Sequence, residues 1–432
     1  MFLDFTVENY RSIKEPVTLS AVAQKSSFRQ AKTTGKRQGI KPDHEIAPGY
    51  HIDGWDIDIL PVLAIFGANA SGKSNVIQAL NYLLFLMIFG YQKSTYLQQL
   101  IKQPKLDSFK LNAISSVQPT KFELRTIFDG DIYTYSLVIN KNHIFSERLT
   151  YIPVKTKRSR LLFDRYQEDD TNKITWKIGA AFTGSHTQLK DSISNNDLFI
   201  NILLKLTVNI IKPFNNWMHR RWHSTEIGND TFDSIYIRIS QILDEPLSDY
   251  LIKRVLRILQ KFDTGLSNII IEPIPKTSDY KIYAVHKTHD NDEIRWLFDE
   301  ESLGTQRLFT LAYRIVVILE VGSLLIIDEL TANLHPNIVK YIIKIFQNSK
   351  ANPKNAQLIF TSHDNTLQRN NLLRRDQIWF TQKRPDHSTE LYPLTDFHVR
   401  NDLAIDKAYL DGRFGAVPFL PEDEEMILQD EE

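Results

Sequence analysis

A loop of eight residues, Gly67-Ala68-Asn69-Ala70-Ser71-Gly72-Lys73-Ser74, constrains this chain more than any other feature. It matches the pattern G-x-x-x-x-G-K-[ST] and lies between a short apolar run at 60–66 and an apolar helical pattern at 75–89. The glycines let backbone N–H groups point inward at phosphate oxygens, and the start of a helix adds partial positive charge. A chance glycine-rich turn is the alternative, and the flanking patterns argue against it. The sequence therefore predicts a phosphate-binding loop, with Lys73 on the phosphates and Ser74 on Mg²⁺.

Two adjacent carboxylates follow a second buried strand pattern, at 324–327. Asp328 is suited to hold Mg²⁺ through water, and Glu329 to polarise a water for attack on the γ-phosphate. The alternative is an ordinary solvated strand end. The phosphate-binding loop elsewhere in the chain favours the catalytic interpretation.

A third buried strand pattern, at 357–360, leads to His363. Phosphate-binding loops lie at the carboxyl edge of parallel sheets, so a histidine there is placed to donate a hydrogen bond to the γ-phosphate. Without the other motifs, a structural histidine that caps a loop would be preferred.

The segment 301–307, Glu-Ser-Leu-Gly-Thr-Gln-Arg, directly precedes an apolar helical pattern. Ser302 and the backbone at Gly304 form a second potential anion site at a helix start. Taken alone, Ser302 is predicted to be a helix N-cap. This interpretation holds in part even if the residue also binds an anion.

These four motifs, in this order, resemble the ABC-class ATPase head of SMC, RecF and OLD-type proteins, within the AAA family. The resemblance covers about 1–150 and 290–400, and the stretches 5–12, 330–336 and 409–418 are also similar to segments of this group. Within it, the chain most resembles the RloA/AbiLi-like ATPases of bacterial restriction and abortive-infection loci.

The resemblance implies an α/β fold: a P-loop NTPase head of the ABC type, with a mixed sheet, flanking helices, an antiparallel β lobe and a helical insertion. It implies four parts: 1–150 with the phosphate-binding loop, 151–290 as a helical insertion or lid, 291–400 with the signature, the carboxylates and the switch histidine, and 401–432 as an extension with an acidic tail.

The resemblance also implies ATP and Mg²⁺ as ligands. Glu329 is then the catalytic base, His363 the switch histidine, and Lys73 a third catalytic residue. The resemblance assigns Mg²⁺ binding to Ser74 and Asp328. The nucleotide-binding residues are Gly67, Asn69, Ala70, Ser71, Gly72, Lys73, Ser74, Asn75 and Arg11, together with Ser302 and Gly304, which act on the nucleotide held by a second copy.

Two features depart from the family pattern. No convincing Q-loop glutamine follows the phosphate-binding loop, and Gln118 is a weak candidate. The signature reads Ser-Leu-Gly-Thr-Gln rather than Ser-Gly-Gly-Gln. The first departure leaves the coupling between the nucleotide and the insertion undefined.

Composition excludes several function classes. The chain has no cysteine, which excludes disulfide scaffolds, thiolate zinc sites and cysteine nucleophiles, and 52 basic residues balance 52 acidic ones. No apolar run is long enough to span a bilayer and no signal peptide pattern opens the chain, so we expect a cytoplasmic protein with no membrane partner. Basic clusters within 151–290 make nucleic acid a further candidate partner; they are Lys155, Lys157, Arg158 and Arg160, then His219, Arg220 and Arg221 beside Trp217 and Trp222, then Lys253, Arg254 and Arg257.

The sequence thus predicts an ATP-hydrolysing switch that forms a homodimer or higher homo-oligomer through an ATP sandwich. The seventy or so residues after His363 contain no Asp-x-Asp, so we expect a separately encoded effector protein, in anti-phage defence. The alternatives are a RecF-like DNA-repair ATPase and an ATP-dependent oligomeric scaffold with little turnover.

Overall fold

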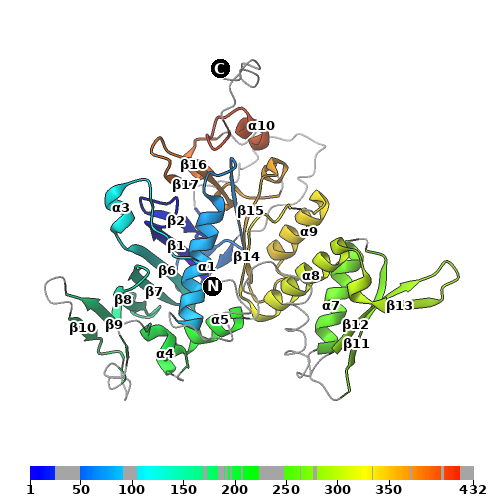
Figure 1. The fold of residues 1–432 in the computed structure, drawn as a ribbon, viewed down its shortest axis with the longest axis horizontal. Helices are drawn as coiled ribbons and strands as arrows, with labels where there is room; N and C mark the ends of the chain where they lie inside the picture. The colour runs from blue at the N-terminus through cyan, green and yellow to red at the C-terminus, as the bar shows by residue number, and fades with distance from the viewer. Residues whose placement is uncertain are drawn as a thin grey trace, which may run out of the picture.

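The computed structural model describes residues 1–24, 49–90, 105–168, 173–182, 189, 193–194, 197–205, 208–222, 248–262, 264–275, 280–332, 334–369, 372–399 and 403–418 (Figure 1). The stretch 24–48 is basic, polar and poor in large apolar residues, a composition that predicts a loop. This stretch, apart from residue 24, and the acidic tail from residue 421 lie outside the described part.

A five-stranded sheet carries the phosphate-binding loop. In spatial order its strands are β14 (Leu324–Ile327), β15 (Gln357–Thr361), β5 (Val62–Gly67), β16 (Ile378–Lys383) and β17 (Thr389–Pro393). The first four are parallel and β17 is antiparallel to β16. β14, β15 and β5 are buried on both faces, which is why their sequences are nearly continuous apolar runs. The carboxyl ends of the parallel strands therefore meet at one edge.

A seven-stranded antiparallel sheet packs beside it. In spatial order its strands are β10 (Ile174–Ile178), β9 (Arg160–Gln167), β8 (Ile144–Ile152), β7 (Asp131–Ile139), β6 (Thr120–Phe128), β1 (Phe2–Glu8) and β2 (Val17–Ser20). The buried amide of Gln357 joins the two sheets, because it accepts from the Phe2 N–H at 2.7 Å and donates to the Phe2 carbonyl at 3.0 Å.

Two hydrophobic cores lie on the two faces of the five-stranded sheet. Leu63 and Ile65 of β5 face the first core, with α1 (Lys73–Phe89) and the seven-stranded sheet. Val62, Ala64 and Phe66 face the second, with α8 (Leu303–Val321) and α9 (Pro336–Gln347). The alternation along β5 thus places α1 and α8 on opposite faces (Figure 1).

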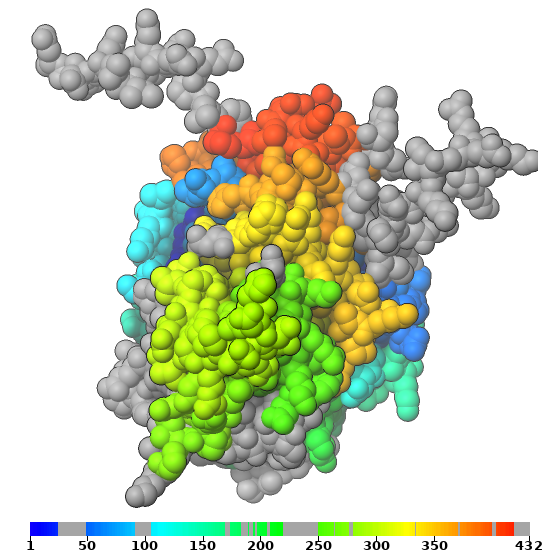
Figure 2. All heavy atoms as spheres, turned by 90° about the vertical axis from the view of Figure 1, so that its right-hand side faces the viewer, coloured from blue at the N-terminus to red at the C-terminus, as the bar shows by residue number. Residues whose placement is uncertain are grey.

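The remaining elements surround these two sheets. α7 (Ser248–Lys261) packs on α8 and on a three-stranded sheet of β11 (Leu266–Pro273), β12 (Tyr280–Lys287) and β13 (Glu293–Leu297). Figure 2 shows this lobe projecting toward the viewer. The other helices and strands are short: β3 (Tyr50–His51), β4 (Asp58–Ile59), α3 (Ala113–Val117), α4 (Phe199–Lys205), η3 (Asn209–Ile211), α5 (Lys212–Trp222), η4 (Phe298–Glu300), η5 (Asn365–Gln368), η6 (Arg375–Gln377), η7 (Leu394–Asp396) and α10 (Ile405–Leu410).

The predicted α/β fold, with a mixed sheet, flanking helices and an antiparallel β lobe, is confirmed. Residues 151–290, expected to form a compact helical lobe, contain helices but are not one helical body. Strands β9 and β10 extend the sheet of β1, α4 and α5 contact α1, and α7 contacts α8. Apolar side chains of β9, β10, α4 and α5 are buried in or packed against the first core and those of α7 are buried in the second, which ties the segment to both faces of the head. The domain boundaries at 150 and 290 stay predictions.

Candidate active site

The phosphate-binding loop joins the end of β5 to the start of α1. Gly67 and Gly72 have φ of 153° and 107°, and Ala70 has φ of 61°. A Cβ on Gly67 would lie 2.5 Å from the Thr381 carbonyl oxygen, and one on Gly72 would lie 2.7 Å from Thr389 Cγ2. Glycine is therefore required at both positions, by backbone conformation and by the close approach of β16 and β17.

Two threonines from the far end of the chain hold this loop from behind. The hydroxyls of Ser71 and Thr381 lie 2.6 Å apart, and Thr389 Oγ1 donates to the Ser71 carbonyl oxygen at 3.0 Å. Thr389 Oγ1 also lies 2.7 Å from Ser12 Oγ, which accepts from Asn75 Nδ2 at 2.6 Å. Sequence reasoning missed both threonines, since neither lies in a recognisable motif. The Ser71 and Asn75 side chains thus support the loop.

The Lys73 ammonium is buried under the loop. Its Nζ donates to the carbonyl oxygens of Gly67 at 2.8 Å and Ala68 at 2.9 Å. Burial lowers the pKa of Lys73, and the charges of Asp328 and Glu329 act in the opposite direction. The N-cap of α1 is Gly72, which has no capping side chain, so the first N–H groups of the helix remain available for an anion. A lysine, glycine-lined amides and two carboxylates form a donor set that fits a nucleotide phosphate with Mg²⁺.

Asp328 and Glu329 follow β14 at the same sheet edge. Thr361 Oγ1, at the end of β15, donates to Asp328 Oδ1 at 2.6 Å and accepts from the Glu329 backbone N–H at 2.7 Å. Glu329 has φ of 53°, and its carboxylate is exposed. The loop lysine and both carboxylates are thus brought together, as the motifs predict.

His363 lies beside Glu329. Its Nε2 is 3.7 Å from Glu329 Oε1, and both side chains are about half exposed, at 42% and 55%. The preceding Ser362 is buried, and its hydroxyl lies 3.1 Å from the Thr331 hydroxyl and accepts from the Asp364 N–H at 2.9 Å. The hydrogen bonds of Ser362 therefore fix the turn, and the His363 imidazole that follows is partly exposed to solvent.

Arg11 borders a pocket of about 680 Å³ next to the loop, lined by Arg11, Ser12, Ala70, Asp107, Ser108, Phe109, Lys110, Leu111, Lys383 and His387. Arg11 has φ of 51°, donates a backbone N–H to the Asp107 carbonyl at 2.7 Å and donates a side-chain N–H to Gln78 Oε1. The buried amide of Asn9 fixes the facing wall: it donates to the Ser115 and Gln118 carbonyls and accepts from the Phe109 N–H. Three cationic side chains, those of Arg11, Lys110 and Lys383, thus line a cavity beside the phosphate-binding loop together with one carboxylate, that of Asp107. The balance of charge favours an anionic ligand.

The signature turn forms the N-terminus of α8. Ser302 is its N-cap and accepts from the Thr305 N–H at 3.1 Å, while Gln306 Nε2 donates to the carbonyls of Asp299 and Glu301. Ser302, Leu303 and Gly304 are exposed. α8 and the sheet β11–β13 lie on the opposite side of the five-stranded sheet from α1 (Figure 1). The turn is therefore a capped helix start that faces solvent.

The sequence matches a known protein family over residues 62–369, more than two thirds of the chain, and the family is described as "AAA domain, putative AbiEii toxin, Type IV TA system". The chain belongs to this family. No curated protein sequence matches it.

Solved structures similar to this AAA-family chain include three SMC heads. An Smc head bound to the C-winged helix domain of ScpA is 13% identical, with a TM-score of 0.44, covering 95% of this chain and 99% of that one. The SMC head of Thermotoga maritima is 11% identical, with a TM-score of 0.40, covering 91% and 98%. A Pyrococcus furiosus Smc head with an extended coiled coil, bound to the C-terminal domain of ScpA, is 12% identical, with a TM-score of 0.38, covering 96% and 98%.

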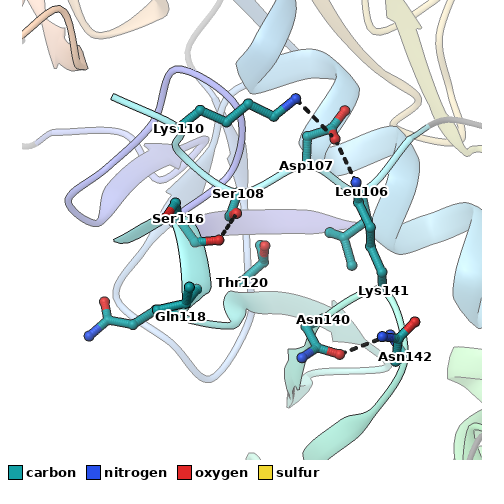
Figure 3. A pocket seen from close by; sticks show the side chains of 11 residues that line it. Leu106, Asp107, Ser108, Lys110, Ser116, Gln118, Thr120, Asn140, Lys141 and Asn142 are labelled. Carbon is teal, nitrogen blue, oxygen red and sulfur yellow. Dashed lines mark hydrogen bonds and ion pairs between the residues drawn. The ribbon is translucent and has the colours of Figure 1, made fainter. Parts of the chain in front are cut away.

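Gln118, the weak Q-loop candidate, lines a second pocket of about 270 Å³ in the antiparallel lobe (Figure 3). There its carbonyl accepts from Asn9, and Lys110 and Lys141 both pair with Asp107. In this AAA-family chain the pocket of Gln118 thus adjoins the one that borders the phosphate-binding loop, because Asp107, Ser108 and Lys110 line both, but Gln118 itself does not line the latter.

The basic clusters within 151–290 differ in their surroundings. Lys155, Lys157 and Arg158 are exposed before β9, and Arg160 is exposed at its first residue. Arg254 pairs with Glu320. The side chains of His219, Arg220, Arg221 and Trp222 lie outside the described residues, and Trp217 is buried. Nucleic-acid binding stays a prediction. Within the described residues, no helix is long and apolar enough to cross a membrane.

Proposed function

We propose that this AAA-family protein binds Mg²⁺ and ATP and hydrolyses ATP. The convergence of Lys73, Asp328, Glu329 and His363 at the carboxyl ends of three neighbouring parallel strands carries the proposal. Open α/β sheets bind their ligands at this edge. Burial of the Lys73 ammonium has a cost that the charges of Asp328 and Glu329 offset only in part, and a phosphate ligand explains why the chain retains it.

Each residue has a separate task in the proposed reaction. Lys73 and the first amides of α1 hold the phosphates, and Ser74 and Asp328 hold the metal ion. Glu329 accepts a proton from the attacking water, and His363 donates a hydrogen bond at the γ-phosphate. Mg²⁺, when bound, supplies positive charge that offsets the charge on the phosphate oxygens. Arg11 borders the neighbouring pocket and is placed to contact the rest of the nucleotide.

The proposed active unit contains two copies. Ser302 and Gly304 are exposed on the face opposite α1, and the space around Gly304 is open among the described residues, where a Cβ would approach only Ser302 Oγ, at 3.6 Å. Nothing in the described part of its own chain therefore needs a glycine at 304, whereas an incoming phosphate on a second copy would. Closure on ATP and reopening after hydrolysis would make the pair a switch.

We infer that the switch is the ATPase component of a bacterial anti-phage defence system and acts through a partner effector. The description of the family as a putative toxin of a type IV toxin–antitoxin system supports this role over DNA repair. A RecF-like ATPase would show DNA-stimulated turnover without a partner protein, and a scaffold would assemble on ATP with little turnover.

Phosphate release from MgATP tests the proposed chemistry. The wild-type chain should turn over, and Glu329→Gln should retain binding of a fluorescent ATP analogue while hydrolysis falls by about 100-fold or more. Lys73→Ala should lose binding itself. Turnover by Glu329→Gln at the wild-type rate would show that the catalytic base is misassigned, and the absence of both binding and turnover in the wild type would refute the proposed function.

A further inference from the structure

Thr361 connects the two carboxylates of the site to the sheet. It is the last residue of β15, which lies between the carboxylate strand β14 and the loop strand β5. Its side chain is fully buried, donates to Asp328 Oδ1 at 2.6 Å and accepts from the Glu329 N–H at 2.7 Å. Its carbonyl accepts from the Leu330 N–H at 3.1 Å. One residue thus bonds to three consecutive residues of the turn after β14.

The two hydroxyl bonds require a hydroxyl group. A hydroxyl has one proton and two lone pairs, so Thr361 Oγ1 can donate to a carboxylate and accept from an amide at the same time. Valine has nearly the same shape but can do neither. The donated bond orients the Asp328 carboxylate.

Glu329 needs an external constraint because its backbone is unfavourable. A φ of 53° in a residue other than glycine costs about 1–2 kcal/mol, so the turn persists only when its surroundings fix it. The exposed Glu329 side chain has few neighbours to fix it, and the amide bond to Thr361 holds the residue from behind. The direction of its carboxylate therefore depends on Thr361.

We propose that Thr361 is a positioning residue for hydrolysis, which sets the orientation of Asp328 for the metal ion and of Glu329 for the attacking water. This inference rests on the proposed ATPase function. Thr361 acts through these two residues, so its loss should affect turnover and the requirement for Mg²⁺ more than nucleotide binding.

Four substitutions at three fully buried threonines test it. Thr361→Val should lower kcat by about 10–100-fold and raise the MgCl₂ concentration for half-maximal rate, with the affinity for a fluorescent ATP analogue within about threefold of wild type. Thr361→Ser should restore kcat to within about threefold. Thr381 lies on β16, on the other side of β5 from β15, and its hydroxyl is bonded to Ser71 in the loop. Thr381→Val should therefore weaken nucleotide binding instead. Thr126→Val is the control, because Thr126 is fully buried in β6 and its hydroxyl has no partner among the described residues.

The outcomes separate this inference from the proposed function. If the wild type turns over, Glu329→Gln does not, and Thr361→Val keeps the wild-type kcat and Mg²⁺ dependence, the positioning role is wrong while the ATPase assignment stands. A Thr361→Ser variant as slow as Thr361→Val would also refute it, since the role belongs to the hydroxyl. If Thr361→Val does not fold, Thr361→Ala is compared with Thr361→Ser by the same measurements and decides in the same way.

Discussion

The imidazole Nε2 of His363 lies 3.7 Å from Oε1 of Glu329, and each side chain is about half exposed. Two exposed groups at this separation contribute little to stability, because water screens their interaction. The strands that carry them are buried and fixed by other contacts. We therefore expect both residues to serve the reaction rather than the fold.

The first prediction follows from this separation of roles. His363→Ala should change the free energy of unfolding by less than about 0.5 kcal/mol. Loss of a donor at the γ-phosphate should nevertheless lower kcat by about 100-fold. Thermal unfolding and phosphate release, measured on the same preparation, check both values. A large drop in melting temperature would show instead that the histidine supports the turn.

The second prediction concerns the signature turn. Gly304→Ala should fold as wild type, because its Cβ would meet only Ser302 Oγ among the described residues, at 3.6 Å, but should hydrolyse ATP more slowly, because the added methyl would crowd a phosphate held by a second copy. Gly304→Glu should fold equally well, yet lose at least about 100-fold in rate, because its carboxylate would face the phosphates held by a second copy.

Mixing two inactive variants checks that the signature acts across two copies. Gly304→Glu and Lys73→Ala are each expected to be inactive alone. An equimolar mixture should recover about a quarter of the wild-type rate, since half of the dimers are mixed and each of these has one complete site of two. A mixture that stays inactive, while gel filtration shows mixed dimers, would place the signature and the phosphate-binding loop in the same chain's site.

The third prediction is a pH dependence of stability at β1. Burial raises the pKa of Asp4 from 3.8 to about 6, with Arg125 acting against this and Glu123 adding to it. The folded state therefore binds a proton more tightly than the unfolded state, and this contribution to stability is lost as pH rises from about 4 to 6. Above that range the ionised Asp4 carboxylate lowers the free energy of unfolding by up to about 3 kcal/mol.

Asp4→Asn should remove this cost. The variant should melt higher than wild type at pH 7.5, and the difference should shrink toward zero near pH 4. Thermal unfolding in a pH series checks the slope. A variant that is less stable than wild type at pH 7.5 would show that the ion pair of Asp4 with Arg125, 3.2 Å apart, outweighs the burial of the carboxylate.

Sequence reasoning found the parts of the site that are local in the chain. The phosphate-binding loop lies within eight consecutive residues, and Asp328 and His363 each follow a buried apolar strand closely, so pattern and spacing were sufficient. It could not find Thr381 and Thr389, because they reach the loop only when β16 and β17 pair beside β5, about three hundred residues after it. Strand β9 was missed because its apolar residues, Leu161–Phe163, are too few to show a clear period.

The last prediction concerns a buried charge between β8 and α4. Glu147 of β8 is fully buried and accepts from the N–H groups of Phe199 and Ile200, both at 2.8 Å, at the start of α4. It also accepts from the Tyr135 hydroxyl at 3.1 Å, and Arg165 Nη1 lies 3.9 Å away. Burial raises the pKa of Glu147, and Arg165 and these hydrogen bonds act against that rise.

Glu147→Ala would leave two amides and the Tyr135 hydroxyl without this acceptor and would remove the negative charge beside Arg165, so the free energy of unfolding should fall by about 3–5 kcal/mol. Glu147→Gln keeps the shape and one acceptor oxygen, and should cost about 1–3 kcal/mol. Because α4 contacts α1, the alanine variant should also expose α4 to faster amide hydrogen exchange. Urea unfolding and hydrogen exchange measure the two effects. Equal stability of the alanine and glutamine variants would show that the cost comes from the lost charge alone, since both remove it and only glutamine retains an acceptor.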